Sequence, residues 1–189
     1  MNYLVRIDTP SVKKYVLANN TLKGIRGGSA ILDSLNLKDT AALLDLEDTS
    51  VLPENPEKIQ FYLGGGGGLV GFNDQEKMNE FIQKLKQIYF EKTGMSSVLI
   101  SSIPYQSDQS HSDQNFQKNR EFLNEQLSYA VPLSSNEAVL TATERVCELC
   151  RLHPVKKSEK HFGESQNICE VCVKKITQMQ GKKKGLKKY

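Results

Sequence analysis

The four cysteines of this chain stand in two pairs with the spacing of metal ligands. Two residues separate Cys147 from Cys150 and Cys169 from Cys172, and eighteen residues lie between the pairs. Two thiolates at this spacing hold one ion from a tight knuckle, and two knuckles complete a closed tetrahedral sulfur site. The spacing therefore predicts a structural Zn²⁺ site, with iron or a redox dithiol pair as the alternative.

Residues 147–172 contain few apolar side chains, so we expect zinc binding and local folding to be one event. His153 and His161 lie between the pairs. Because four thiolates already complete a tetrahedral site, both histidines are expected at the surface.

A run of five glycines is the second unusual feature, and it consists of Gly64, Gly65, Gly66, Gly67 and Gly68. It offers backbone amides but no metal ligand or catalytic side chain. A Walker loop needs Gly-Lys-Ser/Thr after the glycines, whereas Leu69 and Val70 follow here. A dinucleotide fingerprint must open directly into a helix, and a strand-like segment intervenes. Two interpretations stay open: a flexible hairpin tip, or a backbone platform for a nucleotide or a partner domain.

Two further segments carry groups that bind phosphate. Arg26 and Ser29 flank a Gly-Gly pair and could present a cation and amides at the start of a helix around Ile31. The alternative is a Gly-Gly kink between helices with Arg26 solvated. The C-terminal lysines could bind RNA phosphates or form a solvated end; they are Lys182, Lys183, Lys184, Lys187 and Lys188.

Charge is distributed unevenly along the 189 residues. The net charge is +3, yet residues 151–189 carry +8 and residues 1–150 carry −5. This asymmetry fits an acidic globular body with a basic end that faces a polyanion, or that only aids solubility. No apolar stretch approaches the length of a membrane span, and the N-terminus does not resemble a signal peptide. We therefore expect a cytoplasmic protein with reduced cysteines.

Periodicity predicts a ferredoxin-like α+β domain. Strands are expected over residues 3–8, 59–63, 69–72 and 97–104, the middle two joined as a hairpin by the glycines. Helices are expected from Val12, around Ile31 after interruptions at Asn19-Asn20 and Gly24, after an Asn73 cap, and over 114–130. The order is β-α-β-β-α-β with an extra helix, an antiparallel sheet with one face under two helices. We expect a domain over 1–132, a zinc module over 133–178 and a basic tail over 179–189.

These motifs together resemble a known family. The order of residues 3–10, 22–33 and 61–68, followed by the two cysteine pairs, resembles the large palm-containing subunit of type III CRISPR effector complexes. The resemblance covers the N-terminal palm half and the zinc module, about residues 1–175. It implies a ferredoxin-like palm, related to nucleotide cyclases and polymerases. It also implies a second, catalytic palm that carries Gly-Gly-Asp-Asp and makes cyclic oligoadenylates from ATP.

The chain departs from this family at the catalytic hairpin. Gly66 and Gly67 stand where the resemblance implies aspartates, and two-metal nucleotidyl transfer needs at least two carboxylates near both ions. Asp8 could supply one. We therefore expect no catalytic residue here, and Asp8 only if the chain is an enzyme. The expected function is a degenerate palm and zinc module in antiviral defence, which contacts ATP and Mg²⁺ at a composite site with a catalytic palm or another effector subunit.

Two other functions stay open from the sequence. One is a small self-pairing nucleotidyl cyclase or polymerase that uses Asp8. The other is a zinc-stabilised RNA-binding protein that uses the terminal lysines.

Overall fold

The computed structural model of the chain describes residues 1–19, 21–44, 58–64, 66–94, 98–105, 113–129, 145–161 and 164–185. The chain divides into two compact units. Unit 1 comprises Met1–Pro10, Asp33–Ile88 and Ser97–Pro132, and unit 2 comprises Ser11–Leu32, Tyr89–Ser96 and Leu133–Tyr189. The expected boundary at residue 132 differs from this division, because residues 11–32 and 89–96 pack with the cysteine module.

A four-stranded antiparallel sheet forms the centre of unit 1. Its strands β1 (Tyr3–Asp8), β2 (Lys58–Gly64), β3 (Gly67–Phe72) and β4 (Leu99–Pro104) lie in the order β2-β3-β1-β4. Each neighbouring pair is antiparallel. This is the strand order of a split β-α-β arrangement, so the predicted antiparallel α+β fold is confirmed.

Alternation along β1 explains why both faces of the sheet are covered. Leu4 points to one face of the sheet. There it forms a buried cluster with Leu69 of β3, Ile103 of β4 and Leu123 of helix α5 (Asp113–Tyr129). The adjacent residue Val5 is also fully buried, although its side chain must point to the opposite face. The strand is therefore buried on both sides.

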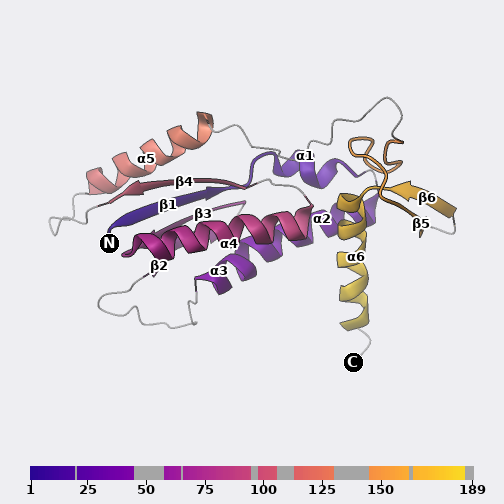
Figure 1. Cartoon of the computed structure of the whole chain (residues 1–189), viewed down its shortest axis with the longest axis horizontal. Helices are drawn as coiled ribbons and strands as arrows, with labels where there is room; N and C mark the ends of the chain where they lie inside the picture. Colours follow the sequence, from indigo (N-terminus) through magenta and orange to yellow (C-terminus); the bar gives the residue numbers. More distant parts are fainter. Residues whose placement is uncertain are drawn as a thin grey trace. The chain divides into compact units, whose positions relative to one another are not determined.

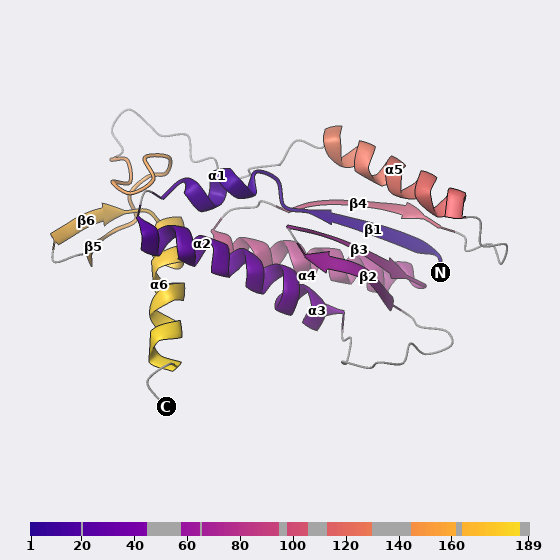
Figure 2. The same ribbon diagram turned by 180° about the vertical axis from the view of Figure 1, so that it is seen from behind.

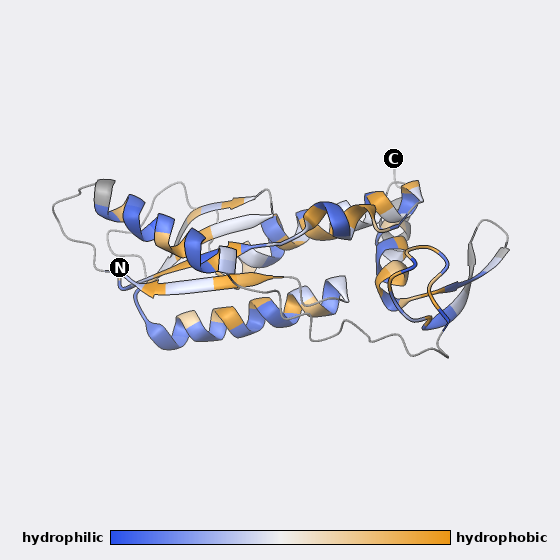
Figure 3. Cartoon of the chain, turned by 90° about the horizontal axis from the view of Figure 1, so that it is seen from above, coloured by the Kyte–Doolittle hydropathy of each residue, from blue (hydrophilic) through white to orange (hydrophobic). Residues whose placement is uncertain are grey.

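Helix α4 (Gln75–Thr93) covers that opposite face of the sheet. Its apolar stripe is buried through Met78, Phe81 and Leu85, and the ring of Phe81 lies 5.2 Å from that of Phe72. Figures 1 and 2 show α4 on one side of the sheet and α5, the extra helix, on the other. Hydrophobic and hydrophilic residues alternate along these helices in Figure 3.

The cap of α4 differs from the prediction. The N–H of Lys77 donates to Asp74 Oδ1 at 2.8 Å, so Asp74 caps the helix, and the Asn73 cap is wrong. The far end agrees with the sequence. Gly94 has φ +71°, and its N–H donates to the Phe90 carbonyl at 2.9 Å, which is the expected glycine C-cap.

The predicted interruption of the first helix at Asn19-Asn20 is confirmed at Asn19, which lies between two helices, and Asn20 is outside the described residues. The further interruption predicted at Gly24 is wrong. Helix α1 (Val12–Leu17) is followed by an unbroken α2 (Leu22–Ser34). Thr21 starts α2, because its Oγ1 accepts from the Gly24 N–H at 3.2 Å. A π-helical segment (Leu35–Asp39) and α3 (Thr40–Leu43) then continue the helical path.

Unit 2 contains a hairpin and a long helix after the first cysteine pair. Strands β5 (Lys157–His161) and β6 (Glu164–Ile168) are antiparallel, and α6 (Glu170–Gly185) follows directly. Helix α6 therefore continues beyond residue 178, into the segment expected as a separate tail. No helix in the described ranges combines the length and apolar character that a membrane crossing requires.

Candidate functional site

The four cysteines come together in unit 2 as a buried sulfur cluster. Their Sγ atoms all lie within 4.8 Å of one another. Two of the separations are 3.8 Å for Cys147–Cys172 and 3.7 Å for Cys150–Cys169. A tetrahedral site with Zn–S bonds of about 2.3 Å has sulfur–sulfur edges of about 3.8 Å. The donor set and its dimensions therefore fit one tetrahedral ion, and these four residues can hold a metal such as zinc.

A tight turn positions the first cysteine pair. The Cys147 carbonyl accepts from the Arg151 N–H at 2.9 Å, and the Cys147 N–H donates to the His153 carbonyl at 2.9 Å. Arg151 adopts the left-handed conformation, φ +55°, which reverses the chain after Cys150. His153 is half-buried rather than a surface residue, and the side chain of His161 lies outside the described part of the chain.

The start of α6 positions the second pair. Cys169 directly precedes the helix, its carbonyl accepts from the Val173 N–H at 3.0 Å, and Cys172 lies in the first turn. The Cys172 N–H is 3.5 Å from the Sγ of Cys169. A helix N-terminus stabilises negative charge, so this location favours thiolates.

One pair of side chains connects the two knuckles. The Glu148 carboxylate accepts from both the backbone N–H and the side-chain amide of Asn167, at 3.2 and 3.0 Å. The Glu148 N–H in turn donates to the Asn167 carbonyl at 3.0 Å. These three bonds fix the Cys147–Cys150 turn against β6, and sequence spacing gave no sign of them.

The electrostatics of the cluster explain why it needs a cation. Hydrogen bonding from the neighbouring thiols, Cys150 first, lowers the pKa of Cys147. Hydrogen bonding with Cys147 in turn raises the pKa of Cys172. Four thiolates this close together would repel one another in the absence of an ion. A divalent ion binds all four thiolates and compensates their repulsion.

The glycine run forms the tip of the β2–β3 hairpin in unit 1. Gly64 pairs with Gly67, and Gly66 lies in the turn, whereas Gly65 lies outside the described residues. Gly64 and Gly66 have φ values of +152° and +92°, which side-chain-bearing residues rarely adopt. A Cβ on Gly68 would overlap the side chain of Leu63. Backbone conformation thus favours glycine at positions 64 and 66, whereas side-chain packing favours it at position 68.

The hairpin tip lies beside the end of β1. The Thr9 N–H donates to the Gly66 carbonyl at 2.6 Å, and Asp8 stands opposite Gly67 in the register. Gly66, Gly67 and Gly68 are buried, whereas Gly64 is half-buried. Ligands therefore have more access to the hairpin from the side of Gly64.

A guanidinium, which sequence reasoning missed, occupies the face of the sheet next to this tip. Arg6 donates through Nη1 to the Gly68 carbonyl at 3.2 Å and through Nε to Asn124 Oδ1 at 3.1 Å. It also lies 5.2 Å from the ring centroid of Tyr62. Burial lowers the pKa of Arg6, and the neighbouring charge of Asp8 opposes that shift. The Asp8 carboxylate is thus neighboured by a cation, which opposes metal binding there.

The predicted phosphate-binding segment of α2 has a different setting from the one expected. Arg26 and Ser29 are exposed, but they lie in the interior of α2 rather than at its start, so the helix start near Ile31 is wrong. The intervening Gly27 and Gly28 face α6. A Cβ on Gly27 would overlap the backbone carbonyl of Lys175, so the Gly-Gly pair forms a notch for α6 and is no kink.

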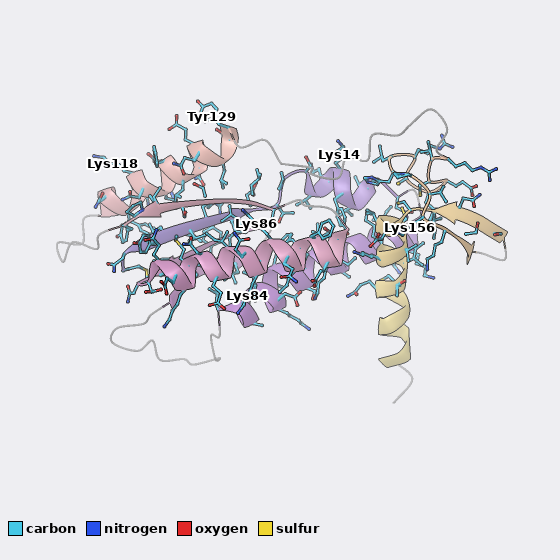
Figure 4. All side chains as sticks on the ribbon, in the orientation of Figure 1. Lys14, Lys84, Lys86, Lys118, Tyr129 and Lys156 are labelled. Atoms are coloured by element: carbon cyan, nitrogen blue, oxygen red, sulfur yellow. The ribbon has the colours of Figure 1, made fainter. Side chains whose placement is uncertain are left out.

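The basic residues are partly outside the described chain. Lys182, Lys183 and Lys184 lie in the last turns of α6, whereas Lys187 and Lys188 lie beyond the described residues. In unit 1, Figure 4 places Lys84 and Lys86 on α4 and Lys118 on α5, helices on opposite faces of the sheet. These exposed lysines of unit 1 therefore do not form one patch.

Comparison with known proteins gives structural matches alone. No protein-family model matches the chain, and no curated protein matches its sequence. Among solved structures, an apo Csm1–Csm4 cassette matches at a TM-score of 0.47 and 14% identity, covering 67% of this chain and 18% of that chain. Csm1 of T. onnurineus matches at a TM-score of 0.45 and 14% identity, covering 67% and 19%.

A third match is a Csm1–Csm4 cassette in complex with cA4, at a TM-score of 0.44 and 14% identity, covering 67% and 18%. The solved structures that resemble this chain thus include Csm1, at TM-scores below 0.5. The chain spans about a fifth of the length of the Csm1 chains it matches. Its activity, ligands and partners are therefore matters for proposal.

Proposed function

We propose that this chain is a palm without catalytic carboxylates, joined to a structural zinc module, in a type III CRISPR-like effector of antiviral defence. The observation that best supports this proposal is the composition of the β2–β3 hairpin. Residues 58–72 contain no Asp or Glu, and the tip where carboxylates would hold metal ions consists of glycines. Two-metal nucleotidyl transfer needs carboxylates that bridge both ions. Asp8 alone, beside Arg6, does not meet that requirement.

The proposed role of the palm is therefore contact rather than chemistry. The half-buried Gly64 side of the hairpin faces ATP and Mg²⁺ at a site completed by a catalytic palm, or another effector subunit, in trans. The exposed Arg26 and Ser29 of α2 are proposed as phosphate contacts in the same complex. We place the protein in the cytoplasm, where the cysteines stay reduced and bind Zn²⁺.

Labelled ATP with Mg²⁺ or Mn²⁺ tests this role directly. The purified chain is expected to give no cyclic or linear oligonucleotide. Addition of a subunit that carries a Gly-Gly-Asp-Asp palm is expected to give a complex whose formation depends on ATP. Arg26→Ala and Ser29→Ala should weaken that dependence without loss of stability. Product formed by the chain alone and abolished by Asp8→Asn would instead establish the self-pairing cyclase and overturn the proposal.

RNA is the second proposed ligand of this effector component. Five lysines in residues 182–188 stand at the end of α6 and after it, and this helix begins beside the metal site. Binding to phosphates through these lysines depends strongly on salt. Filter binding of single-stranded RNA across a salt series measures it, and a signal that does not change with salt would contradict it.

A further inference from the structure

Lys175 is a buried cation in the middle of unit 2. It lies on α6, three residues after Cys172, and 1% of its surface is exposed. Its ammonium donates to the Tyr15 carbonyl and lies 3.9 Å from the centroid of the Tyr15 ring. A buried ammonium is costly unless nearby groups compensate its charge. A carbonyl and a ring face supply only part of that compensation.

The nearest group along α6 that can carry negative charge is Cys172, one helical turn before Lys175 and a member of the buried sulfur cluster. In the described part of the chain, no carboxylate lies within ion-pairing distance of the Lys175 ammonium; the adjacent Lys174 is the one paired with Glu170. Burial lowers the pKa of Lys175, whereas the charges of Cys172, Cys150 and Cys169 raise it. The sulfur cluster, which Cys172 joins one turn before Lys175, is therefore the candidate source of negative charge for this ammonium.

We propose that Lys175 is the counter-cation of the four-cysteine metal site and connects that site to residues 11–32. The inference rests on the proposed metal site. Four thiolates around a divalent ion carry two net negative charges, and the ammonium offsets one of them. Outer residues of this kind tune how tightly a site holds its metal.

The connection to residues 11–32 follows from the packing around Lys175. Gly27 leaves room for the backbone of Lys175, and a Cβ on Gly28 would lie 3.3 Å from the Cε of Lys175. Tyr15, on α1, supplies the carbonyl and the ring. The ammonium therefore reaches its position only when α1 and α2 pack against α6. Metal occupancy should in turn stabilise two helices that precede the first ligand by more than 100 residues.

The decisive variant is Lys175→Met, which keeps the length of the side chain and removes the charge. Metal affinity is measured by competition with a chromophoric chelator, and Co²⁺ absorption reports the ligand set. We expect affinity to fall about 10–100-fold with an unchanged four-thiolate spectrum. The metal-free form should be as stable as the original or more so, because a buried charge is gone. Lys156→Met removes an exposed lysine of the same unit and should change affinity less than about twofold.

The proposal is overturned if folded Lys175→Met binds the metal as tightly as the unchanged protein does. It is also overturned if the metal-free variant loses as much free energy of unfolding as it loses free energy of metal binding. Hydrogen exchange in the unchanged chain gives an independent test, even if the variant does not fold. Removal of metal by a chelator should accelerate exchange of amides 12–17 and 22–32 but leave β1 and β3 protected. Unchanged exchange at 12–17 would also overturn the proposal. A chain that binds no metal at all would refute the metal site itself.

Discussion

Gly27 and Lys175 approach so closely in unit 2 that the carbonyl of Lys175 occupies the space where a side chain at position 27 would begin. This contact makes the Gly-Gly pair of α2 a packing device for α6. Glycine is tolerated within the helix, at a propensity cost of about 1 kcal/mol, because the close approach requires it.

Gly27→Ala should destabilise unit 2, because both partners in the collision are backbone and neither yields easily. The overpacking cost of about 3 kcal/mol outweighs the gain of about 1 kcal/mol in helix propensity. Hydrogen exchange of α6 amides measures the effect. Gly28→Ala should cost less, since its Cβ would lie 3.3 Å from the Cε of Lys175 and would not overlap the backbone.

Ser29→Ala is the matched control for Gly27→Ala, because Ser29 is exposed on the same helix. It should leave α6 exchange unchanged within about 0.5 kcal/mol. If Gly27→Ala behaves like Ser29→Ala, the α2–α6 contact is not what the structure indicates.

Cys150→Ser should abolish tight metal binding and unfold residues 147–172 locally, because three thiolates and a hydroxyl no longer form the closed sulfur site. Metal content by mass spectrometry should fall from about one ion per chain to near zero. Proteolysis should then cut within unit 2 while β1–β4 stay protected. Ser165→Ala, an exposed change on β6, serves as the control. A Cys150→Ser chain with full metal content and protease resistance would refute the site.

Acid should release the metal for the same reason. Thiolates must stay deprotonated to bind, so protons compete with the ion and metal affinity falls as the pH falls. Chelator competition between pH 8 and pH 5 measures this. A pH-independent affinity would contradict a four-thiolate site.

Arg6→Ala should destabilise unit 1 by about 1–3 kcal/mol, because it removes hydrogen bonds to the Gly68 carbonyl and to Asn124. Arg6→Lys should recover little of this loss, since an ammonium cannot reproduce the two directions of the Nε and Nη1 donors. Urea unfolding measures both variants. A double-mutant cycle with Asn124→Ala should give a coupling energy above about 0.5 kcal/mol, and zero coupling would exclude a stabilising contact between them.

Deletion of residues 182–189 tests the basic end without disturbing the buried residues of α6, of which Ile176 is the last one described. The deletion removes five lysines. If these contact RNA phosphates, the salt dependence of binding should become shallower by up to about 0.7 per lost contact on a single strand. An unchanged slope and affinity would assign RNA binding elsewhere or exclude it.

The sequence by itself determined the elements and the metal ligands. The alternation in residues 3–8, the 3.6-residue stripe of α4 and the two C-x2-C pairs are local patterns, and local patterns follow directly from strand, helix and knuckle geometry. The order of those elements also predicted the antiparallel α+β fold, because few topologies accommodate β-α-β-β-α-β.

The tertiary structure alone decided which segments share a core. Residues 11–32 belong to the same compact unit as the cysteines. Arg6 donates a hydrogen bond to Asn124, which is 118 residues away in the sequence, and Lys175 donates one to Tyr15, which is 160 residues away. Lys175 falls at i+3 from Cys172, on the cysteine face of α6, which is the one signal that could have revealed it. Contacts between residues so distant in sequence leave no periodic trace, because they depend on how completed helices and strands pack.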